Sequence, residues 1–494
     1  TIAILLKAIE SRCDGSLPKL AKNINRHLMF EDARGNEFFR IEHCRHDKTH
    51  FNDIIRGTVS TANGTDTHRM YQAFEFFRTK VDSVCKTDED RASLFEIILK
   101  KIPVISMLLA VHDDEQVIFD TINSLGVKLN SAELLKNFIF KDATLHRYFN
   151  THWASAFEHD DDQIEFWNTE KTAGRIFRTN IEVLLYCYLI ARTLKEVKIE
   201  RLFKEYKSWL SGKSSNDNLI LLEDLKQNAA IYYSLPTSQE FQELSHKETE
   251  KRFFHVVENL SITTIYPLIL HIYREVIDNN ERNAMLSVLE SYIVRRVVCK
   301  LTTKNYNNLF ISIIRKLVDA KQSSQSTINA GVLKNILLQF SEETNQFPTD
   351  QVFIEGIKSS QLSNAHAREF LYFIALFEKD SKFTDTSKLS CSSYSVEHMM
   401  PQKWEENWAV ATFDDNQKLN RSRKLRTLGN LTLITKNLNS KLKNDSWLKK
   451  KETLKIFSSL GITKDYVDLD VWDENAIDRR SNDLVKSALL IWQR

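Results

Sequence analysis

At 494 residues the chain is too long for one hydrophobic core, so we expect several domains. Its 42% hydrophobic and 27% charged residues are typical of a soluble globular protein, and no apolar run is long enough to span a bilayer, which argues against a membrane protein. The net charge of +2 singles out no class of partner, and six scattered cysteines without a Cys-x-x-Cys fit a reduced cytoplasmic protein.

The low content of turn-forming residues, 11 Gly and 6 Pro, predicts a mainly α, multidomain protein. Helical periodicity begins at once, with no Met and no capping residue ahead of Ile2, so we expect the natural protein to have residues before Thr1. Residues 1–12 and 66–90 predict helices, and the apolar run at 103–111 predicts a short buried strand.

The next segments continue the helical pattern. Residues 114–143 predict a helix, a turn at 124–126 and a second helix with Ser131 as its N-cap. The acidic stretch at 157–167 is expected to form a loop. From about 175 to 340 nearly the whole chain is amphipathic with helical periodicity, and a last helix is predicted for 476–492.

A different pattern surrounds His398. Residues 393–399 alternate and contain Tyr and Val, which predicts a strand ending at the Glu397-His398 pair. Gly429-Asn430 predicts a turn, 431–435 a second strand, and 436 onward a helix. The expected order is therefore strand, loop, strand, helix.

This order suits a metal-dependent phosphodiesterase. His398 could deprotonate water, because its unperturbed pKa lies near neutrality. Glu397 and Asn439 could supply the hard oxygen ligands that Mg²⁺ or Mn²⁺ prefers, and Lys441 and Lys443 would lie near the phosphates. The alternative is a histidine at a strand end and an asparagine that caps a helix.

The stretch 418–455 contains twelve Lys/Arg and two Asp/Glu, on a body that is otherwise mildly acidic. A local excess of positive charge is typical of a surface that binds a phosphate backbone. The alternative is a solvated basic helix face. The residues expected to contact double-stranded DNA are Arg423, Lys424, Arg426, Lys441 and Lys443.

The motifs "VEHMMP" and "LGNLTLITKNLNSKL" resemble the HNH nuclease ββα-metal module. The resemblance implies that His398 is the catalytic base, that Glu397 and Asn439 bind the metal, and that Asn430 completes the catalytic set by orienting the loop. Many HNH proteins carry a Cys-x-x-Cys in the second half. Thr435 and the residue three places later, Leu438, stand there in this chain, so no structural zinc is implied.

Two further segments, 118–140 and 289–310, resemble the ParB-like domain and the helical connector of GmrSD-type modification-dependent (type IV) restriction endonucleases. The family's Asp-Gly-Gln-Gln-Arg motif would lie just before Thr1. The resemblance implies an NTP site in the first domain. The residues expected to bind the nucleotide are Asn123, Gly126, Lys136 and Asn137. Without the resemblance, the residues favour a helix–turn–helix packing unit over a nucleotide site, and no GxxxxGK loop is present.

Two other clusters are expected to be structural. His43, Cys44, His46 and His50 match no standard zinc spacing, so we expect a solvated strand or loop. Arg295 and Arg296 are adjacent on a predicted helix and therefore diverge, so we expect one of them to pair with an acidic neighbour.

These observations predict three domains: a partial α/β ParB-like domain at 1–175, a helical connector at 176–340, and at 341–494 an HNH-type nuclease domain whose ββα-metal module is embedded in helices. The expected function is metal-dependent cleavage of DNA, specifically modified phage DNA under NTP control, in the cytoplasm and without a membrane partner. Oligomer formation is compatible with it. One alternative is a nucleic-acid-binding or sensing protein with an inactive HNH-like module, and another is a toxin-like nuclease without preference for modified DNA.

Overall fold

The computed structural model describes residues 1–13, 17–43, 45–58, 68–103, 130–173, 176–324, 327–382, 388–408, 410, 412–442 and 444–494. The chain divides into two compact units, Thr1–Glu115 and Gln116–Arg494. Helices dominate both units, as the composition predicts, and the strands described form three two-stranded antiparallel sheets. None of the described helices is both long enough and apolar enough to cross a membrane.

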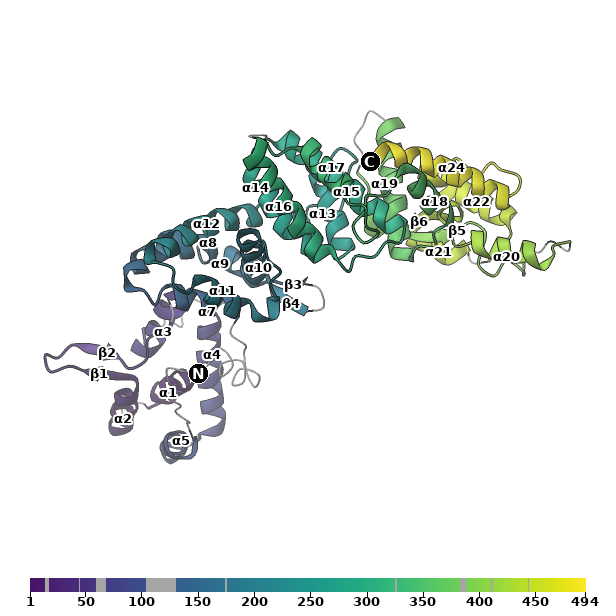
Figure 1. Cartoon of the computed structure of the whole chain (residues 1–494). Helices are drawn as coiled ribbons and strands as arrows, with labels where there is room; N and C mark the ends of the chain where they lie inside the picture. Colours follow the sequence, from purple (N-terminus) through teal and green to yellow (C-terminus); the bar gives the residue numbers. More distant parts are fainter. Residues whose placement is uncertain are drawn as a thin grey trace. The chain divides into compact units, whose positions relative to one another are not determined.

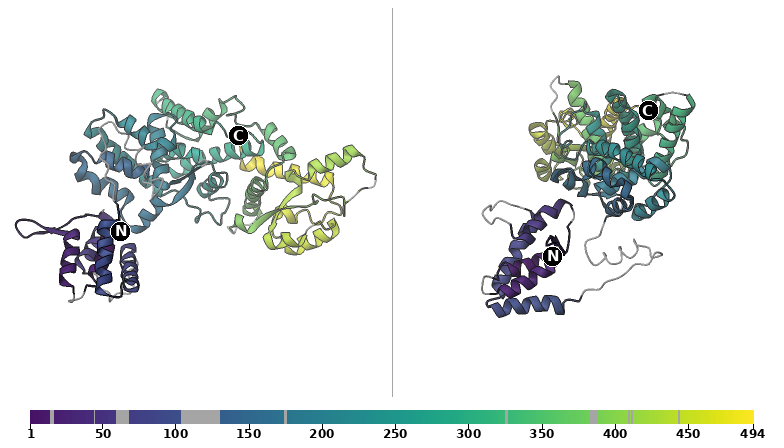
Figure 2. Two further views of the ribbon diagram at one scale, coloured as in Figure 1. Left: turned by 90° about the horizontal axis from the view of Figure 1, so that it is seen from below. Right: turned by 90° about the vertical axis from the view of Figure 1, so that its left-hand side faces the viewer.

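Unit 1 is a small helical cluster with a hairpin. Helix α1 packs against α2, α3 and α4, and its buried side chains Ile4, Leu6 and Ile9 contribute to the core of the unit. Figure 2 shows the β1–β2 hairpin extending from these helices. The elements are α1 (Ile2–Glu10), α2 (Pro18–Leu28), β1 (Met29–Glu31), β2 (Glu37–Phe39), α3 (Arg45–Arg56), α4 (Arg69–Val84) and α5 (Asp88–Lys101).

Two expectations for unit 1 are wrong in detail. The helix predicted over 66–90 ends at Val84, because Thr87 and Asp90 form a capping box that starts α5. His46 and His50 lie on helix α3 rather than on a strand or loop, and His50 stacks on His68 with ring centroids 3.7 Å apart. Cys44 and the strand predicted at 103–111, from residue 104 on, lie outside the described residues.

Unit 2 begins with a large body of helices around a continuous apolar core (Figure 1). The elements of this body are α7 (Ser131–Ile139), α9 (Asp161–Asn168), β3 (Glu170–Ala173), β4 (Ile176–Thr179), α10 (Asn180–Thr193), α11 (Leu202–Leu210), α12 (Ser215–Tyr233), α13 (Thr249–Asn259), η4 (Thr263–Ile265), α14 (Tyr266–Glu275), α15 (Asn279–Val298), α16 (Tyr306–Ser324), α17 (Ala330–Leu338), α18 (Asp350–Ser359) and α19 (Asn364–Lys382). The helical middle predicted from the periodicity is therefore present.

Local capping corrects two expectations in this body. The N-cap of α7 is Asn130, not Ser131: the Asn130 side chain accepts a hydrogen bond from the Glu133 amide at 2.9 Å. The acidic stretch predicted as a loop contains the start of α9. Asp160 caps this helix, and Asp161 and Asp162 stand in its first turn, where negative charge is favoured by the helix dipole.

Arg295 and Arg296 are both buried on α15. Arg295 pairs with Asp350 at 2.7 Å, which confirms that one of the two meets an acidic partner. Its Nε also donates to the Trp492 carbonyl at 2.8 Å, and Arg296 donates to carbonyl groups that include those of Thr302 and Thr344. Both arginines are therefore structural.

The C-terminal part of unit 2 has a second, smaller core and contains the predicted strand, loop, strand and helix in that order. In Figure 1 the β5–β6 sheet lies among helices. The elements are η5 (Cys391–Ser393), β5 (Tyr394–His398), α20 (Asp415–Lys424), η6 (Leu428–Asn430), β6 (Leu431–Thr435), α21 (Lys436–Leu442), α22 (Trp447–Phe457), α23 (Gly461–Lys464) and α24 (Glu474–Ile491). The last of these confirms the terminal helix predicted for 476–492.

Candidate active site

The pairing of β5 with β6 fixes the position of His398. The register places His398 opposite Leu431 and Glu397 opposite Thr432, so both residues lie at the end of the sheet where β6 begins. Helix α21, which carries Asn439, follows β6 directly and packs on both strands. The two strands and the helix therefore form one packed group that contains the Glu397-His398 pair. The side chains of Asn439 and Lys441, and residue Lys443, lie outside the described part.

Asn430 connects the turn before β6 to the loop after His398. Its Nδ2 donates to the carbonyls of Met400 (2.8 Å) and Leu425 (2.9 Å), and its Oδ1 accepts from the Met400 amide and the Trp472 indole, both at 2.9 Å. The side chain is fully buried, and these four bonds use its whole donor and acceptor capacity. Such contacts position the loop, and any direct part of Asn430 in catalysis stays a prediction.

Gly429 and Arg480 hold the same turn from the other side. A Cβ at Gly429 would collide with the Ser481 hydroxyl and the Ile477 carbonyl of α24, so the close approach of this helix requires glycine. The buried Arg480 guanidinium donates to the carbonyls of Leu428 (3.0 Å), Gly429 (3.0 Å) and Leu431 (2.6 Å). Burial lowers the pKa of Arg480 to about 10, so it remains charged at neutral pH.

Glu397 forms a buried ion pair with Lys450. The Lys450 Nζ lies 2.6 Å from Glu397 Oε1 and donates to the His398 carbonyl at 2.8 Å, and the lysine side chain is completely buried. Burial raises the pKa of the Glu397 carboxyl and lowers the pKa of the Lys450 amine, and the attraction between the two groups opposes both shifts. The predicted metal ligand therefore already has a cationic partner.

His398 is a half-buried, neutral imidazole. Burial lowers its pKa to about 4, and the positive charges of Lys450 and Arg426 act in the same direction. Its Nε2 lies 3.0 Å from the side-chain nitrogen of Gln402, which can only donate, so Nε2 accepts and the ring proton stays on Nδ1. The neutral imidazole keeps a lone pair that can accept a proton, and the low pKa makes His398 a weaker base than a solvent-exposed histidine.

The residues around His398 suit a hard divalent cation in part. Lys450 bonds one carboxylate oxygen of Glu397, and the His398 backbone amide also bonds this carboxylate, so a metal could use only the lone pairs that these two bonds leave. Carboxylate and amide oxygens are the donors that Mg²⁺ and Mn²⁺ prefer. Glu397 could supply such an oxygen, and the part of Asn439 stays a prediction because its side chain lies outside the described part of the chain.

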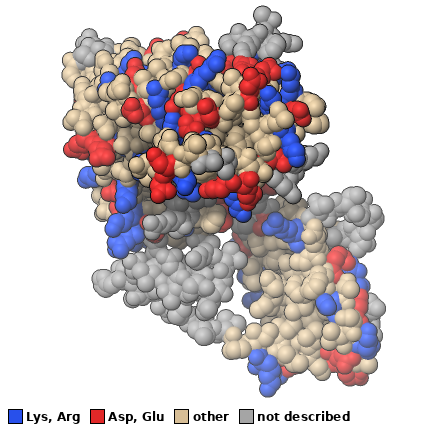
Figure 3. Space-filling model, turned by 90° about the vertical axis from the view of Figure 1, so that its right-hand side faces the viewer, with Lys and Arg blue, Asp and Glu red and all other residues tan. Residues whose placement is uncertain are grey.

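Ion pairs use much of the charge of the 418–455 stretch. The predicted DNA contact Lys424 pairs with Asp478, and the buried Arg421 pairs with Glu474 at 2.5 Å and lies over the Phe413 ring. Figure 3 shows basic and acidic side chains interleaved on this end of unit 2. Exposed residues of the stretch for which the described part of the chain shows no ion pair are Arg423, Arg426, Lys436 and Lys449.

The predicted nucleotide residues are only partly placed. Asn123 and Gly126 lie outside the described residues. Lys136 and Asn137 lie on α7, where Asn137 is exposed and the Lys136 ammonium pairs with Glu133 (2.6 Å) and Glu158 (3.1 Å). These ion pairs raise the pKa of Lys136 despite its burial.

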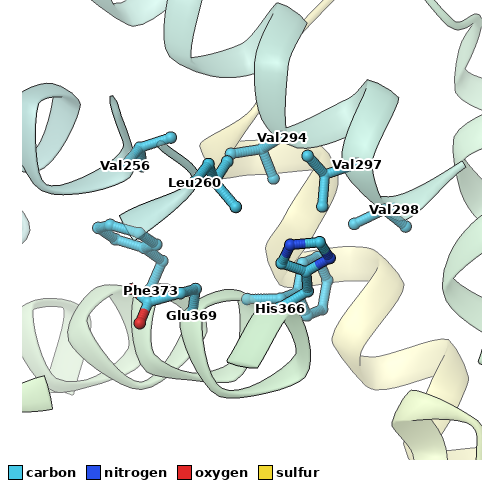
Figure 4. Close-up of a pocket in the computed structure, with 9 residues that line it drawn as sticks. Val256, Leu260, Val294, Val297, Val298, His366, Glu369 and Phe373 are labelled. Atoms are coloured by element: carbon cyan, nitrogen blue, oxygen red, sulfur yellow. The ribbon is translucent and has the colours of Figure 1, made fainter. Parts of the chain in front are cut away.

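Among the described residues, one further group has three possible metal-ligand atoms close together. It consists of His255, Glu369 and Cys391, whose ligand atoms all lie within 4.8 Å of one another. Hydrogen bonds already join them, His255 to Glu369 at 2.6 Å and Cys391 to Glu369 at 3.3 Å, and Arg368 adds a positive charge 3.2 Å from Glu369. Figure 4 shows the neighbouring pocket, lined mostly by valines and phenylalanines and about 20 Å³ in volume. A structural network therefore accounts for this cluster.

The roles of Lys450, Arg480 and Gln402 were not predicted from the sequence, where Lys450 counted only as one of the cations of the 418–455 stretch. A signal existed for Lys450, because Trp447, Lys450 and Leu454 share one face of α22 and the other two are apolar. Arg480 is likewise a charged residue that shares the buried face of its helix, α24, with apolar residues. Gln402 carried no comparable signal.

The comparison with known families agrees with the C-terminal part of this description. Residues 347–487 match the family model of the C-terminal domain of GmrSD restriction endonucleases. The match covers well under half of the chain. No curated protein was found to match it.

The contacts of Asn430 predict a large stability loss for Asn430→Ala. The substitution leaves four buried polar groups without partners, and each such group typically costs about 1–3 kcal/mol. We expect the free energy of unfolding, measured by urea denaturation, to fall by at least about 3 kcal/mol. The exposed Asn420→Ala on α20 is the matched control, and equal losses in the two variants would show that Asn430 does not hold the loop.

The buried ion pair predicts coupling between Glu397 and Lys450. Lys450→Met leaves the Glu397 carboxyl buried without its partner, and breaking such a pair typically costs about 3–5 kcal/mol. Adding Glu397→Gln should recover part of the loss in a double-mutant cycle followed by urea denaturation. Lys451→Met is the control, because Lys451 has no buried charged partner: it lies 3.8 Å from the fully exposed Asp470 and donates to the Leu469 carbonyl at 3.4 Å. Additive effects of the two substitutions would contradict the pairing.

Proposed function

We propose that this chain is a metal-dependent DNA endonuclease of the GmrSD type, with an HNH-like ββα module as its nuclease centre. The observation that carries the proposal is His398, a neutral imidazole at the end of β5, inside the segment that matches the restriction endonuclease domain. The reaction is hydrolysis of a phosphodiester bond, with double-stranded DNA as substrate.

The residues around His398 would divide the work as follows. His398 Nε2 accepts the proton of the attacking water, and Gln402 holds that nitrogen as an acceptor until substrate arrives. Lys450 fixes the orientation of Glu397 and, through the His398 carbonyl, the end of the strand. A divalent ion held by Glu397 and Asn439 would neutralise charge on the scissile phosphate.

The exposed cations in the 418–455 stretch would follow the DNA backbone. Arg423 lies in the last turn of α20 and Arg426 just beyond it, close in sequence to the turn that holds Asn430, and Lys436 begins α21. Lys424 is less suited, because its ammonium already pairs with Asp478. Contacts of this kind are made to phosphates and carry no base information.

Control by NTP and preference for modified phage DNA rest on the resemblance of residues 118–140 and 289–310 to the same enzymes. We place the nucleotide site in the ParB-like N-terminal region. Lys136 and Asn137 are the two residues of this predicted site that the structure describes. We place the enzyme in the cytoplasm. A cleavage panel on plain and modified DNA, with and without NTP, tests both proposals and also separates this enzyme from a toxin-like nuclease.

A second function is favoured by the ion pair itself. If the Lys450 ammonium permanently replaces the metal beside Glu397, the module binds or senses nucleic acid without cutting it. Metal-dependent cleavage that requires His398 distinguishes the two functions.

We expect His398→Ala to reduce DNA cleavage by about 10²–10⁴-fold, the usual contribution of a general base, while urea unfolding and DNA binding change little. Cleavage by the wild type should require Mg²⁺ or Mn²⁺ and stop with EDTA. His159→Ala, which removes a histidine with a largely exposed side chain, is the control. Full activity of the His398 variant would overturn its assignment as the base, and activity that survives chelation would overturn the metal requirement.

The free cations predict a change in the salt dependence of DNA binding. For Arg423→Ala/Arg426→Ala, the slope of log affinity against log salt should flatten by about 0.9 for each phosphate that the variant no longer neutralises, measured by fluorescence anisotropy in EDTA. Lys418→Ala/Lys455→Ala removes the same charge from the same stretch, but from residues paired with Asp415 and Asp468, and should change the slope much less. Equal slopes for the two double variants would show that net charge alone governs binding.

A further inference from the structure

The β1–β2 hairpin, which extends from the helices of unit 1 (Figure 2), has two different faces. Phe30 and Phe38 are direct partners across the ladder and stack with ring centroids 5.4 Å apart, yet the two residues are 44% and 45% exposed. Met29 and Phe39 lie on the opposite face of the pleat and pack against the core of the unit. One face therefore anchors the hairpin, and the other presents a stacked pair of rings to solvent.

The surroundings of the rings leave one aromatic face open. The Arg40 guanidinium lies 5.6 Å from the centroid of the Phe30 ring and donates to the Arg26 carbonyl at 2.6 Å, so the rings lie beside the end of α2. The Phe38 ring, in the part of the chain that the structure describes, stacks on Phe30 and meets no other ring or cation. A further flat group can therefore extend the stack from Phe38.

The turn at the tip of the hairpin uses its acidic residue and leaves its cation free. The Asp32 carboxylate accepts hydrogen bonds from the backbone amides of Arg34 (2.8 Å) and Asn36 (2.9 Å) and from the Asn36 side chain (3.0 Å). Gly35 takes φ +85°, a conformation that glycine adopts without strain. The Arg34 side chain is exposed and forms no ion pair with a described residue.

Helix α2 adds a cationic face next to the rings. Lys19, Lys22 and Arg26 are spaced by three and four residues, so they share one side of the helix, while Ile24 and Leu28 are buried on the other. All three cations are exposed, the helix contains no acidic residue, and the described residues give none of the three an ion pair. A row of free cations of this kind suits a phosphate backbone.

The acidic residues of the hairpin lie away from the rings. Glu31 and Glu37 are partners in the ladder and project from the anchored face of the pleat, because side chains alternate along a strand. Glu42, just after the hairpin, pairs with Lys48 at 3.3 Å. The exposed rings and the free cations therefore form one surface without a carboxylate on the side of the rings.

We propose that this surface binds an unpaired stretch of DNA. A base stacks on the open face of Phe38, and Arg34 and the three cations of α2 contact the phosphates. Aromatic side chains stack only on bases whose faces are accessible, as they are in a single strand. The choice of DNA over RNA rests on the proposed function. Free cations beside exposed rings favour nucleic acid over a protein partner.

Fluorescence anisotropy of the full chain in EDTA tests the proposal on a single-stranded DNA, on its duplex and on the same sequence as RNA. We expect Phe38→Ala to weaken binding of the single-stranded DNA by about 5–150-fold, the effect of one stacked base, and to change binding of the duplex little. Phe38→Tyr keeps a ring and should retain the affinity. Phe76→Ala on α4 is the control, because Phe76 is 56% exposed in the same unit.

A salt titration tests the cations separately. Lys19→Ala/Lys22→Ala should flatten the slope of log affinity against log salt by about 0.7 for each phosphate of the single strand that is no longer neutralised. Lys86→Ala/Lys100→Ala removes the same charge from residues that already have partners, the Asp82 carbonyl and the Glu96 carboxylate, and should change the slope much less.

Three results would overturn the proposal: equal affinity of Phe38→Ala and Phe76→Ala for the single strand, tighter binding of RNA than of DNA, or loss of self-association in Phe38→Ala with DNA binding unchanged. The last result, measured by sedimentation, would make the surface an interface between copies of the chain. Cleavage with Mg²⁺ is followed separately. Phe38-dependent binding without cleavage would refute the proposed nuclease and leave this surface standing, and cleavage with binding independent of Phe38 would do the reverse.

Discussion

The candidate nuclease module depends on the Arg480 guanidinium and on three of the four carbonyl groups to which it donates, those in the turn before β6. Burying a charge without a carboxylate partner is expensive, and hydrogen bonds to carbonyl groups offset part of that cost. Arg480 obtains these bonds from Leu428, Gly429 and Leu431, so the turn before β6 cannot change shape without exposing the charge to an apolar core. That turn places Asn430, and Asn430 in turn places the loop after His398.

In the helical body, too, buried arginines donate hydrogen bonds to backbone carbonyl groups. Arg295 and Arg296 donate to carbonyls of the 343–350 connection and of Trp492, and the Trp492 indole donates to the buried Glu290 at 3.0 Å. Glu290 also pairs with Arg252, so this end of the chain joins a buried charged network on α13 and α15. The first part of helix α24 therefore packs on η6, the turn before β6. The end of α24 is fixed to the helical body.

The sequence predicted secondary structure best where the pattern of residue types is local. The alternation of 393–399, the Gly429-Asn430 turn and the helical periods predicted the order strand, loop, strand, helix, because these patterns are local. Capping choices between adjacent residues, such as Asn130 and Ser131, depend on which side chain reaches the free amide and were not decided locally. The ion pairs of Arg421, Lys424 and Lys450 join residues about 50 positions apart, so a count of charges along 418–455 overstated the free positive surface.

The attachment of α24 has a consequence for the order in which the protein is made. A ribosome releases β5 and β6 well before Arg480 and Trp492, and until those residues emerge the turn that places His398 lacks its guanidinium. The centre is therefore completed only when almost the whole chain has been made. If the centre cuts DNA, the cell holding the gene is exposed to a working nuclease only after the remainder of the chain, including any regulatory region before it, has already been synthesised.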